Sequence, residues 1–202
     1  MNIVAYIVLF FYAMAILLIF FYGLAQLNLL FNYLKSKKTK KNHEKLDFSN
    51  PQEIPFVTIQ LPIYNEKYVV KRLLNQIAIL DYPIDKFEIQ VLDDSTDDSI
   101  SETNNIVLTI AATGINIQHI TRTNRIGFKA GALKAGLVTA KGEFIAIFDA
   151  DFLPEQNWLL KTVPYFKNEK VGVVQTRWGH INRNYSILTK IQAFALDAHF
   201  TL

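Results

Sequence analysis

The first 34 residues contain no Asp, Glu, Lys or Arg, and this feature constrains the chain more than any other. From Ile3 to Ala25 the sequence is almost unbroken in its apolar character. About 20 apolar helical residues cross the hydrocarbon core of a bilayer, so this segment can span one with some tilt. A cleaved signal peptide would begin with basic residues and end at a small-residue cleavage site, and neither is evident. The sequence predicts a transmembrane helix over residues 1–34, with a buried core helix as the alternative.

Residues 35–54 form the next segment, and its first half is rich in lysine. Six lysines and one glutamate occur between residues 35 and 45, a local charge of +5 in a chain whose net charge is +3. Lysine-rich loops stay on the cytoplasmic side of a membrane, and their charges attract anionic headgroups. We predict a basic juxtamembrane linker over 35–54 and a cytoplasmic location for the residues after it. A simple solvated linker is the alternative reading. No nucleic-acid partner is expected, because the basic charge does not lie on the folded part.

Residues 55–202 alternate between short apolar runs rich in β-branched residues and longer segments with helical spacing. This alternation is typical of βαβ units and predicts an α/β domain with a mainly parallel, Rossmann-like sheet. The absence of cysteine excludes a disulfide scaffold, a zinc–thiolate site and a cysteine nucleophile. The expected strands are 56–63, 87–93, 115–121, 143–150 and 171–178, and the expected helices are 66–80, 97–112, 129–139, 155–166 and 185–200.

Asp149 and Asp151 follow the fourth expected strand, whose sequence is the apolar run FIAIF. In an extended chain, residues two apart point to the same side, about 6.5–7 Å apart at Cα. Two carboxylates placed so repel each other unless a cation lies between them, and Mg²⁺ or Mn²⁺ is often held by one or two carboxylates plus substrate phosphates. The pair therefore indicates a divalent-metal site. The alternative is a pair of exposed aspartates that ends the strand at a turn.

Asp93 and Asp94 end the second expected strand. Carboxylates only accept hydrogen bonds, which suits ribose hydroxyls and a base N–H rather than phosphates. We predict nucleotide contact for this pair, and helix capping for Asp97 and Asp98, which begin the next helix. A calcium-binding loop is excluded because the central glycine and the distant glutamate of that motif are missing.

The third expected strand leads to the only basic cluster on this edge, Arg125 and Lys129, with Gly127 and Gly131 between and after them. Positive side chains opposite paired carboxylates favour a diphosphate site, although a lysine at a helix start is often only solvent-facing. The glycines permit close backbone approach. The spacing fits neither a Walker loop nor a Rossmann glycine fingerprint, which weakens the kinase, NTPase and dehydrogenase interpretations.

Six segments, taken in order, resemble family-2 glycosyltransferases with the GT-A fold. They are VTIQLPIYNE, VLDDSTDDS, NRIGFKAGAL, AIFDADFLP, VVQTRW and LDAHF. Within that family they look most like the cellulose-synthase-like branch, including glucomannan synthases. The resemblance covers residues 56–200, and it implies a partial GT-A domain over 55–202 that binds the nucleotide-sugar.

The resemblance also implies roles for individual residues. Tyr64, Glu66 and Asp93 should contact the nucleoside, with Asp94 close to it, and Lys129 should lie near the diphosphate. Asp149 and Asp151 match the Asp-x-Asp motif that holds the nucleotide-sugar and a divalent metal. The family inverts the anomeric centre by direct displacement, with a carboxylate as general base.

The family's general base lies in a later Glu-Asp motif, followed by a Gln-x-x-Arg-Trp motif. Beyond Asp151 the chain offers only Glu155, Glu169 and Asp197, and none of them has that context. We therefore expect a fragment truncated after the donor-binding half, with the catalytic base beyond Leu202. The late transmembrane helices that form a polymer channel in the family are likewise not matched.

The leading hypothesis is a membrane-anchored, metal-dependent hexosyltransferase that uses a UDP- or GDP-sugar donor and a polysaccharide acceptor. A lipid acceptor, such as ceramide or polyprenyl phosphate, is the alternative within enzymes. A different class is a non-catalytic nucleotide-sugar-binding membrane protein. Donor turnover stimulated by metal supports the enzyme, whereas tight binding without turnover supports the binding protein.

Overall fold

The computed structural model describes residues 3–37 and 54–201. It contains two compact units, one formed by Met1–Asn42 with Gln175–Leu202 and the other by His43–Val174. Each unit is described by itself.

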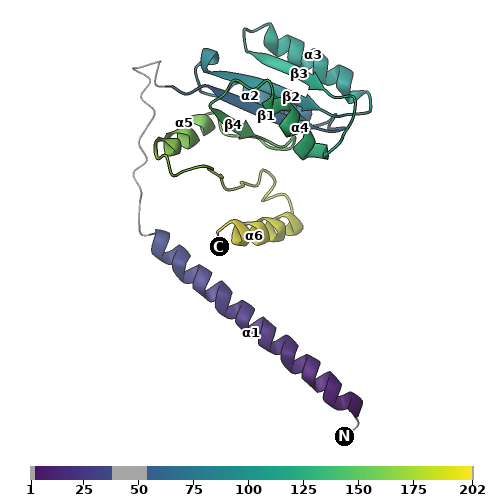
Figure 1. The fold of residues 1–202 in the computed structure, drawn as a ribbon, viewed down its shortest axis with the longest axis vertical. Coiled ribbons are helices and arrows are strands. Elements are labelled where there is room, and N and C mark those ends of the chain that lie inside the picture. The colour runs from purple at the N-terminus through teal and green to yellow at the C-terminus, as the bar shows by residue number, and fades with distance from the viewer. Residues whose placement is uncertain (1–2, 38–53, 202) are drawn as a thin grey trace. The chain divides into compact units, whose positions relative to one another are not determined.

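The N-terminal helix α1 runs over Ile3–Lys37 (Figure 1). Its sequence is apolar along nearly all of its length. Its stretch Ile3–Lys35 is long and apolar enough to cross a membrane, and its side chains are exposed rather than packed into a protein core. The expectation of an apolar helix with membrane-spanning length is confirmed. The predicted linker over 35–54 falls mostly outside the described residues.

The second unit is built on a parallel sheet with the strand order β3-β2-β1-β4 (Figure 1). The predicted α/β class with a parallel sheet is therefore confirmed. The strands are β1 (Val57–Ile63), β2 (Phe87–Asp93), β3 (Ile117–Thr121) and β4 (Phe144–Ile147). The helices are α2 (Val70–Ala78), α3 (Ser99–Ala111), α4 (Phe128–Leu137) and α5 (Trp158–Thr162), with short 3-10 helices η2 (Ile84–Lys86) and η3 (Val163–Lys167).

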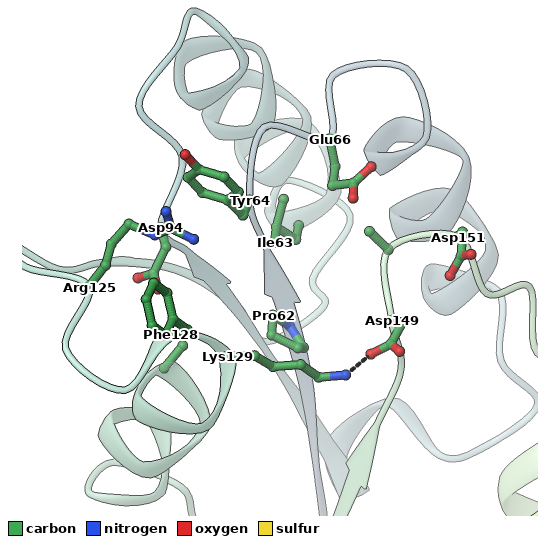
Figure 2. Close-up of a pocket in the computed structure, with 12 residues that line it drawn as sticks. Pro62, Ile63, Tyr64, Glu66, Asp94, Arg125, Phe128, Lys129, Asp149 and Asp151 are labelled. Atoms are coloured by element: carbon green, nitrogen blue, oxygen red, sulfur yellow. Dashed lines mark hydrogen bonds and ion pairs between the residues drawn. The ribbon is translucent and has the colours of Figure 1, made fainter. Parts of the chain in front are cut away.

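The parallel register brings the carboxyl ends of the central strands to one edge of the sheet. Ile63 at the end of β1 pairs with Asp93 at the end of β2. The segment after β4 and the start of α4 reach the same edge (Figure 2). In open α/β sheets, ligands bind beyond the carboxyl ends of the strands. This edge is where a functional site is expected.

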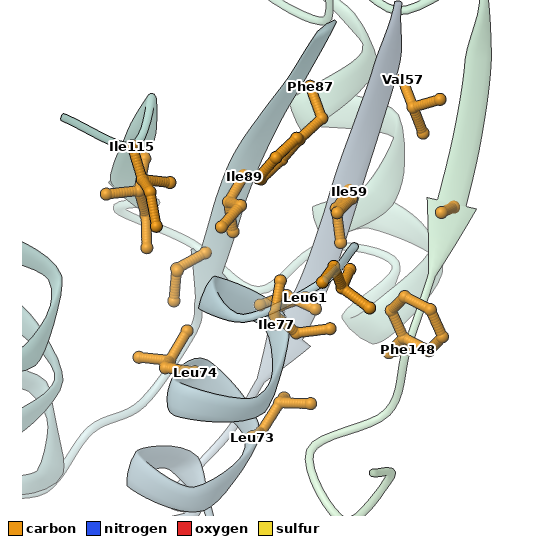
Figure 3. Packing of buried hydrophobic residues seen from close by; sticks show 14 of the residues in the cluster. Val57, Ile59, Leu61, Leu73, Leu74, Ile77, Phe87, Ile89, Ile115 and Phe148 are labelled. Carbon is orange, nitrogen blue, oxygen red and sulfur yellow. The ribbon is translucent and has the colours of Figure 1, made fainter. Parts of the chain in front are cut away.

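One face of the sheet is apolar and is covered by α2 (Figure 3). Ile59 and Leu61 of β1 pack there with Leu73, Leu74 and Ile77 of α2, and all five side chains are fully buried. Complete burial of such a side chain is worth about 1.5–3 kcal/mol. This face supplies the core that holds the strands in place.

The opposite face of the sheet is buried but polar. Thr58 donates a hydrogen bond to Glu88 at 2.7 Å, and Gln60 donates one to Gln90 at 3.0 Å, so neighbouring strands are linked by side chains as well as backbone. Helix α4 approaches this face closely, since a Cβ at Gly136 would meet the Gln60 amide nitrogen at 2.6 Å. The glycine thus lets the helix that carries Lys129 lie directly on the sheet.

The other unit contains α6 (Ile187–Thr201), which confirms the helix expected over 185–200. The strand expected over 171–178 is wrong: these residues have no regular secondary structure, and Val173 is 84% exposed. β-branched residues favour a strand only where a neighbouring strand and a buried face receive them.

Candidate functional site

The loops after β1 and β2 are joined by hydrogen bonds into one rim. The Asn65 backbone N–H donates to Ser95 Oγ at 2.8 Å, and the Thr96 backbone N–H donates to Asn65 Oδ1 at 2.9 Å. The Asp94 backbone N–H donates to the Ile63 carbonyl at 3.0 Å. Asn65 adopts a left-handed φ of 54°, which asparagine tolerates better than most residues. The rim fixes where the adjacent Tyr64 and Glu66 lie.

A pocket of about 370 Å³ opens at this edge (Figure 2). Side chains from the segments after β1, β2, β3 and β4 meet there, as the sequence predicted for a single polar edge. Six of the predicted site residues and the predicted metal residue Asp151 line it. The lining residues are Pro62, Ile63, Tyr64, Glu66, Asp94, Arg125, Phe128, Lys129, Ala132, Asp149, Ala150 and Asp151.

One side of the pocket is formed by stacked side chains. The Arg125 guanidinium lies over the Tyr64 ring, 3.3 Å from its centroid, and 5.5 Å from the centroid of Phe128. Arg125 Nε is buried and has no hydrogen-bond partner among the described residues. A flat guanidinium on an aromatic ring provides both a π surface and N–H donors, which suits a nucleobase. We call Tyr64, Asp94, Arg125 and Phe128 the nucleoside side.

Asp94 is bound by Arg122, which lies just after β3. Arg122 Nε donates to Asp94 Oδ1 at 2.8 Å, and Nη2 donates to Asp94 Oδ2, so the pair is bidentate. The same guanidinium donates to the backbone carbonyls of Ile126 and Phe128 at 3.2 and 3.1 Å. Arg122 therefore connects the end of β2 to the loop that carries Arg125.

Asp93 does not line the pocket. Its side chain is fully buried, Oδ2 lies 2.9 Å from His119 Nε2, and Oδ1 accepts a hydrogen bond from the Ser95 backbone at 2.9 Å. Burial alone would raise the pKa of Asp93, but the hydrogen bonds from His119 and Ser95 outweigh it and hold the pKa below its ordinary value. Nucleoside contact by Asp93 stays a prediction. In this structure its carboxylate shapes the turn that presents Asp94.

The opposite side of the pocket carries its exposed charges, and we call Lys129, Asp149 and Asp151 the cation side. Lys129 Nζ is paired with Asp149 Oδ1, and these side chains are 53% and 40% exposed (Figure 2). Asp149 and Asp151 lie in a turn closed by the Phe152 N–H and the Asp149 carbonyl at 3.0 Å, not in the extended strand assumed from sequence.

The donor set of the cation side fits a hard divalent cation. Residues 3–37 and 54–201 contain no group of three or more His, Asp or Glu side chains arranged as a metal cage. Mg²⁺ and Mn²⁺ bound with substrate phosphates need only one or two protein carboxylates, since waters and phosphate oxygens complete the shell. Asp149 and Asp151 could supply two such carboxylates, and Lys129 could supply positive charge for the phosphates.

Sequence reasoning missed several residues of this edge. Arg122, Phe128 and His119 were not singled out, although Arg122 joins Asp94 to the loop that contains Ile126 and Phe128. No motif distinguishes Arg122 from Arg125 in TRTNR. Only the parallel register of β2 and β3, which pairs Asp93 with Thr121, shows that the residue after Thr121 comes next to Asp94.

Candidate acids further along the chain have local partners. Asp197 accepts hydrogen bonds from Arg177 at 2.6 Å and ion-pairs with Arg183 at 3.2 Å, and the Arg177 bond holds the pKa of Asp197 below its usual range. Glu155 is exposed and paired with Lys161 at 2.5 Å. A general base near neutral pH needs a pKa raised toward 7. Asp197 has the opposite shift.

Comparisons with known proteins find relatives of this chain. The model of "Glycosyl transferase family 2" matches residues 58–200. The "Probable glucomannan 4-beta-mannosyltransferase 7" of Oryza sativa subsp. japonica is 46% identical over 153 residues, which is 73% of this chain and 26% of that protein. The "Glucomannan 4-beta-mannosyltransferase 1" of Cyamopsis tetragonoloba is 40% identical over 182 residues, which is 86% of this chain and 35% of that protein. The chain thus spans about a quarter to a third of these relatives.

A solved structure shows the same fold. It is the mannosyltransferase PcManGT from Pyrobaculum calidifontis, in complex with GDP-Man and Mn²⁺. The TM-score is 0.59 at 32% sequence identity, and the match covers 76% of this chain and 45% of that one. The parallel sheet described above is therefore the GT-A-like α/β fold.

Proposed function

Because the chain belongs to glycosyl transferase family 2, we propose that it is the donor-binding part of a membrane-anchored, metal-dependent hexosyltransferase. The observation that carries the proposal is a single pocket with a stacked Tyr64–Arg125 pair on one side and Lys129, Asp149 and Asp151 on the other. Such a pocket has separate places for a nucleoside and for a diphosphate with its cation.

Each residue of this pocket has a role in the proposal. Tyr64 and Arg125 stack against and orient the nucleobase, while Glu66 and Asp94 lie near the nucleoside. Lys129 leaves Asp149 and approaches the diphosphate, which frees that carboxylate. Asp149 and Asp151 hold Mg²⁺ or Mn²⁺, which supplies charge stabilisation for the departing diphosphate when bound. The acceptor hydroxyl also needs a base, and none of the described residues is assigned that role.

For the donor, we favour a GDP-sugar over a UDP-sugar. The relatives are described as glucomannan mannosyltransferases, and the solved neighbour was crystallised with GDP-Man and Mn²⁺. An arginine can donate two hydrogen bonds to guanine O6 and N7, and the Arg125 side chain lines the pocket where such a contact would be made. The same relatives favour a polysaccharide acceptor, with a lipid acceptor as the alternative.

We also propose that α1 spans a membrane and that the pocket lies on the cytoplasmic side. The length and apolar character of α1 support the first part, and the lysines that follow it support the second. Because the chain has no cysteine, an Asn42→Cys variant offers one labelling site. Labelling by a membrane-impermeant maleimide only after permeabilisation is expected, and labelling of intact cells would contradict it.

Calorimetry on the full chain in detergent tests the donor proposal. GDP and UDP are titrated with and without Mn²⁺, and release of GDP from GDP-mannose is measured in parallel. Metal-dependent binding with a preference for GDP is expected. Binding that ignores Mn²⁺ would overturn the metal assignment, and tight binding of the donor without its turnover would favour a non-catalytic nucleotide-sugar-binding protein.

A further inference from the structure

We propose that Arg122 is a positioning residue for the nucleoside side, and that Asp94 acts on nucleotide binding through Arg122. The inference rests on the proposed function for the identity of the ligand. Arg122 does not line the pocket itself but contacts the loop at Ile126 and Phe128 that forms part of its wall.

The Arg122 guanidinium forms hydrogen bonds with three other residues of the protein. It holds both oxygens of Asp94 and the carbonyls of Ile126 and Phe128. The side chains of Arg122 and Asp94 are only 15% and 5% exposed, so water competes little for these bonds. A bidentate arginine–carboxylate pair is among the stronger hydrogen-bonded contacts and fixes direction as well as distance.

The loop that Arg122 holds has an unusual backbone. Gly127 and Phe128 both have left-handed φ values, 75° and 48°, and this region is sterically unfavourable for a non-glycine residue such as Phe128. The Ile126 carbonyl also lies so close to α4 that a Cβ on Gly131 would be 2.0 Å from it. A strained loop keeps one conformation only if its surroundings hold it there. Arg122 provides two of those contacts.

This loop delivers Arg125 and Phe128 to the pocket. With the loop held, the Arg125 guanidinium stacks on Tyr64 across the rim. Asp94 lines the pocket, but its charge is compensated by Arg122, so it does not repel an incoming diphosphate. Arg122 and Asp94 therefore act together, and their shared effect is to fix the position of Arg125.

Lysine cannot replace arginine here, because an ammonium group has no planar fork to hold a carboxylate and two carbonyls together. We expect Arg122→Lys and Asp94→Asn each to weaken GDP binding about tenfold, because each variant breaks the paired hydrogen bonds between these two charged groups. The double variant should be no weaker than either single one. Arg72→Lys, an exposed site on α2, is the matched control.

The test compares GDP with inorganic pyrophosphate, each titrated by calorimetry in the presence of Mn²⁺. Pyrophosphate uses only the cation side, so Arg122→Lys should weaken GDP binding and leave pyrophosphate binding unchanged. Parallel loss of both ligands would indicate general damage and overturn the positioning role, as would unchanged GDP affinity. Failure of the wild-type chain to bind either ligand would instead contradict the proposed function. Thermal melting of every variant confirms that it is folded.

Discussion

The two sides of the pocket are organised in different ways. On the nucleoside side, Asp94 is nearly buried and bound by Arg122, and Tyr64 is stacked under Arg125. On the cation side, Lys129 and Asp149 form a half-exposed pair and Asp151 is exposed. The charges of the first side are paired within the protein and shielded from water, whereas those of the second lie near the surface. Variants of the two sides should therefore fail in different ways.

The largest effect is expected for Asp149→Asn and Asp151→Asn. Changes to residues that merely orient metal ligands cost about 10–100-fold in metal affinity, so loss of a ligand should cost more than about 100-fold. Mn²⁺-dependent binding of GDP should disappear by calorimetry while the melting temperature changes little. Asp85→Asn, an exposed site in η2, is the control. Normal Mn²⁺ dependence in both variants would show that the cation lies elsewhere.

A substitution of Gly131 should damage the nucleoside side next most strongly. The new Cβ in Gly131→Ala would lie 2.0 Å from the Ile126 carbonyl, so the loop must move. Overpacking of this kind lowers the free energy of unfolding by about 1–3 kcal/mol. Denaturant titration should show that loss, and GDP affinity should fall more than pyrophosphate affinity.

Gly172→Ala provides the control for that substitution, because nothing lies within 4 Å of a Cβ built there. It should leave stability and binding unchanged. Equal stability of Gly131→Ala and Gly172→Ala would mean that the loop at residue 126 is not tightly held.

Lys129→Met should have moderate and opposite effects on the binding of two ligands. Removal of the ammonium group weakens binding of the Mn²⁺–pyrophosphate complex about tenfold, the scale of one charge-assisted hydrogen bond. It also releases Asp149 from its ion pair, so Mn²⁺ alone should bind more tightly than in the wild type. Calorimetry with each ligand separates the two. Lys134→Met on the same helix should change neither, and parallel weakening of both ligands would contradict the pairing argument.

The smallest effect is expected for the pH dependence of the stability that Asp93 gives to the fold. Its pKa is lower in the folded chain than its ordinary 3.8, so its bonds stabilise the fold above that pH and the contribution is lost as pH falls through the folded pKa. The difference in melting temperature between wild type and Asp93→Asn should shrink below about pH 4. A constant difference down to pH 2 would contradict this explanation.

A second variant of Asp93 tests whether the nucleoside side of the pocket contributes to GDP binding in the absence of metal. We expect Asp93→Ala to weaken GDP binding both with and without Mn²⁺. Weakening seen only with Mn²⁺ would place Asp93 with the cation side.

The sequence predicted the four strands of the sheet, the helices and the edge where polar side chains meet, because these depend on local composition and on the rules of parallel sheets. It could not separate Asp93 from Asp94. Successive strand residues point to opposite faces, and the register places Asp93 on the face of Val91 and His119 and leaves Asp94 for the pocket. Nor could local composition show that VGVVQTRW lacks a neighbouring strand among residues 54–201.

The turn at Asp149 and Asp151 shows a similar limit. The residue types indicated a cation site, but the spacing argument assumed an extended chain and the structure has a turn. The role of Arg122 depends on contacts with residues 4, 6 and 28 positions away in sequence, and no local pattern encodes such a set.

Electron paramagnetic resonance of Mn²⁺ shows whether Asp149 and Asp151 hold the cation. The signal of free Mn²⁺ is recorded as the full chain is added in the presence of GDP. The account predicts that wild-type protein removes the free-ion signal with GDP present and that Asp149→Asn and Asp151→Asn do not. A signal that stays unchanged with wild-type protein, or that falls equally with both variants, would contradict a cation held by these two aspartates.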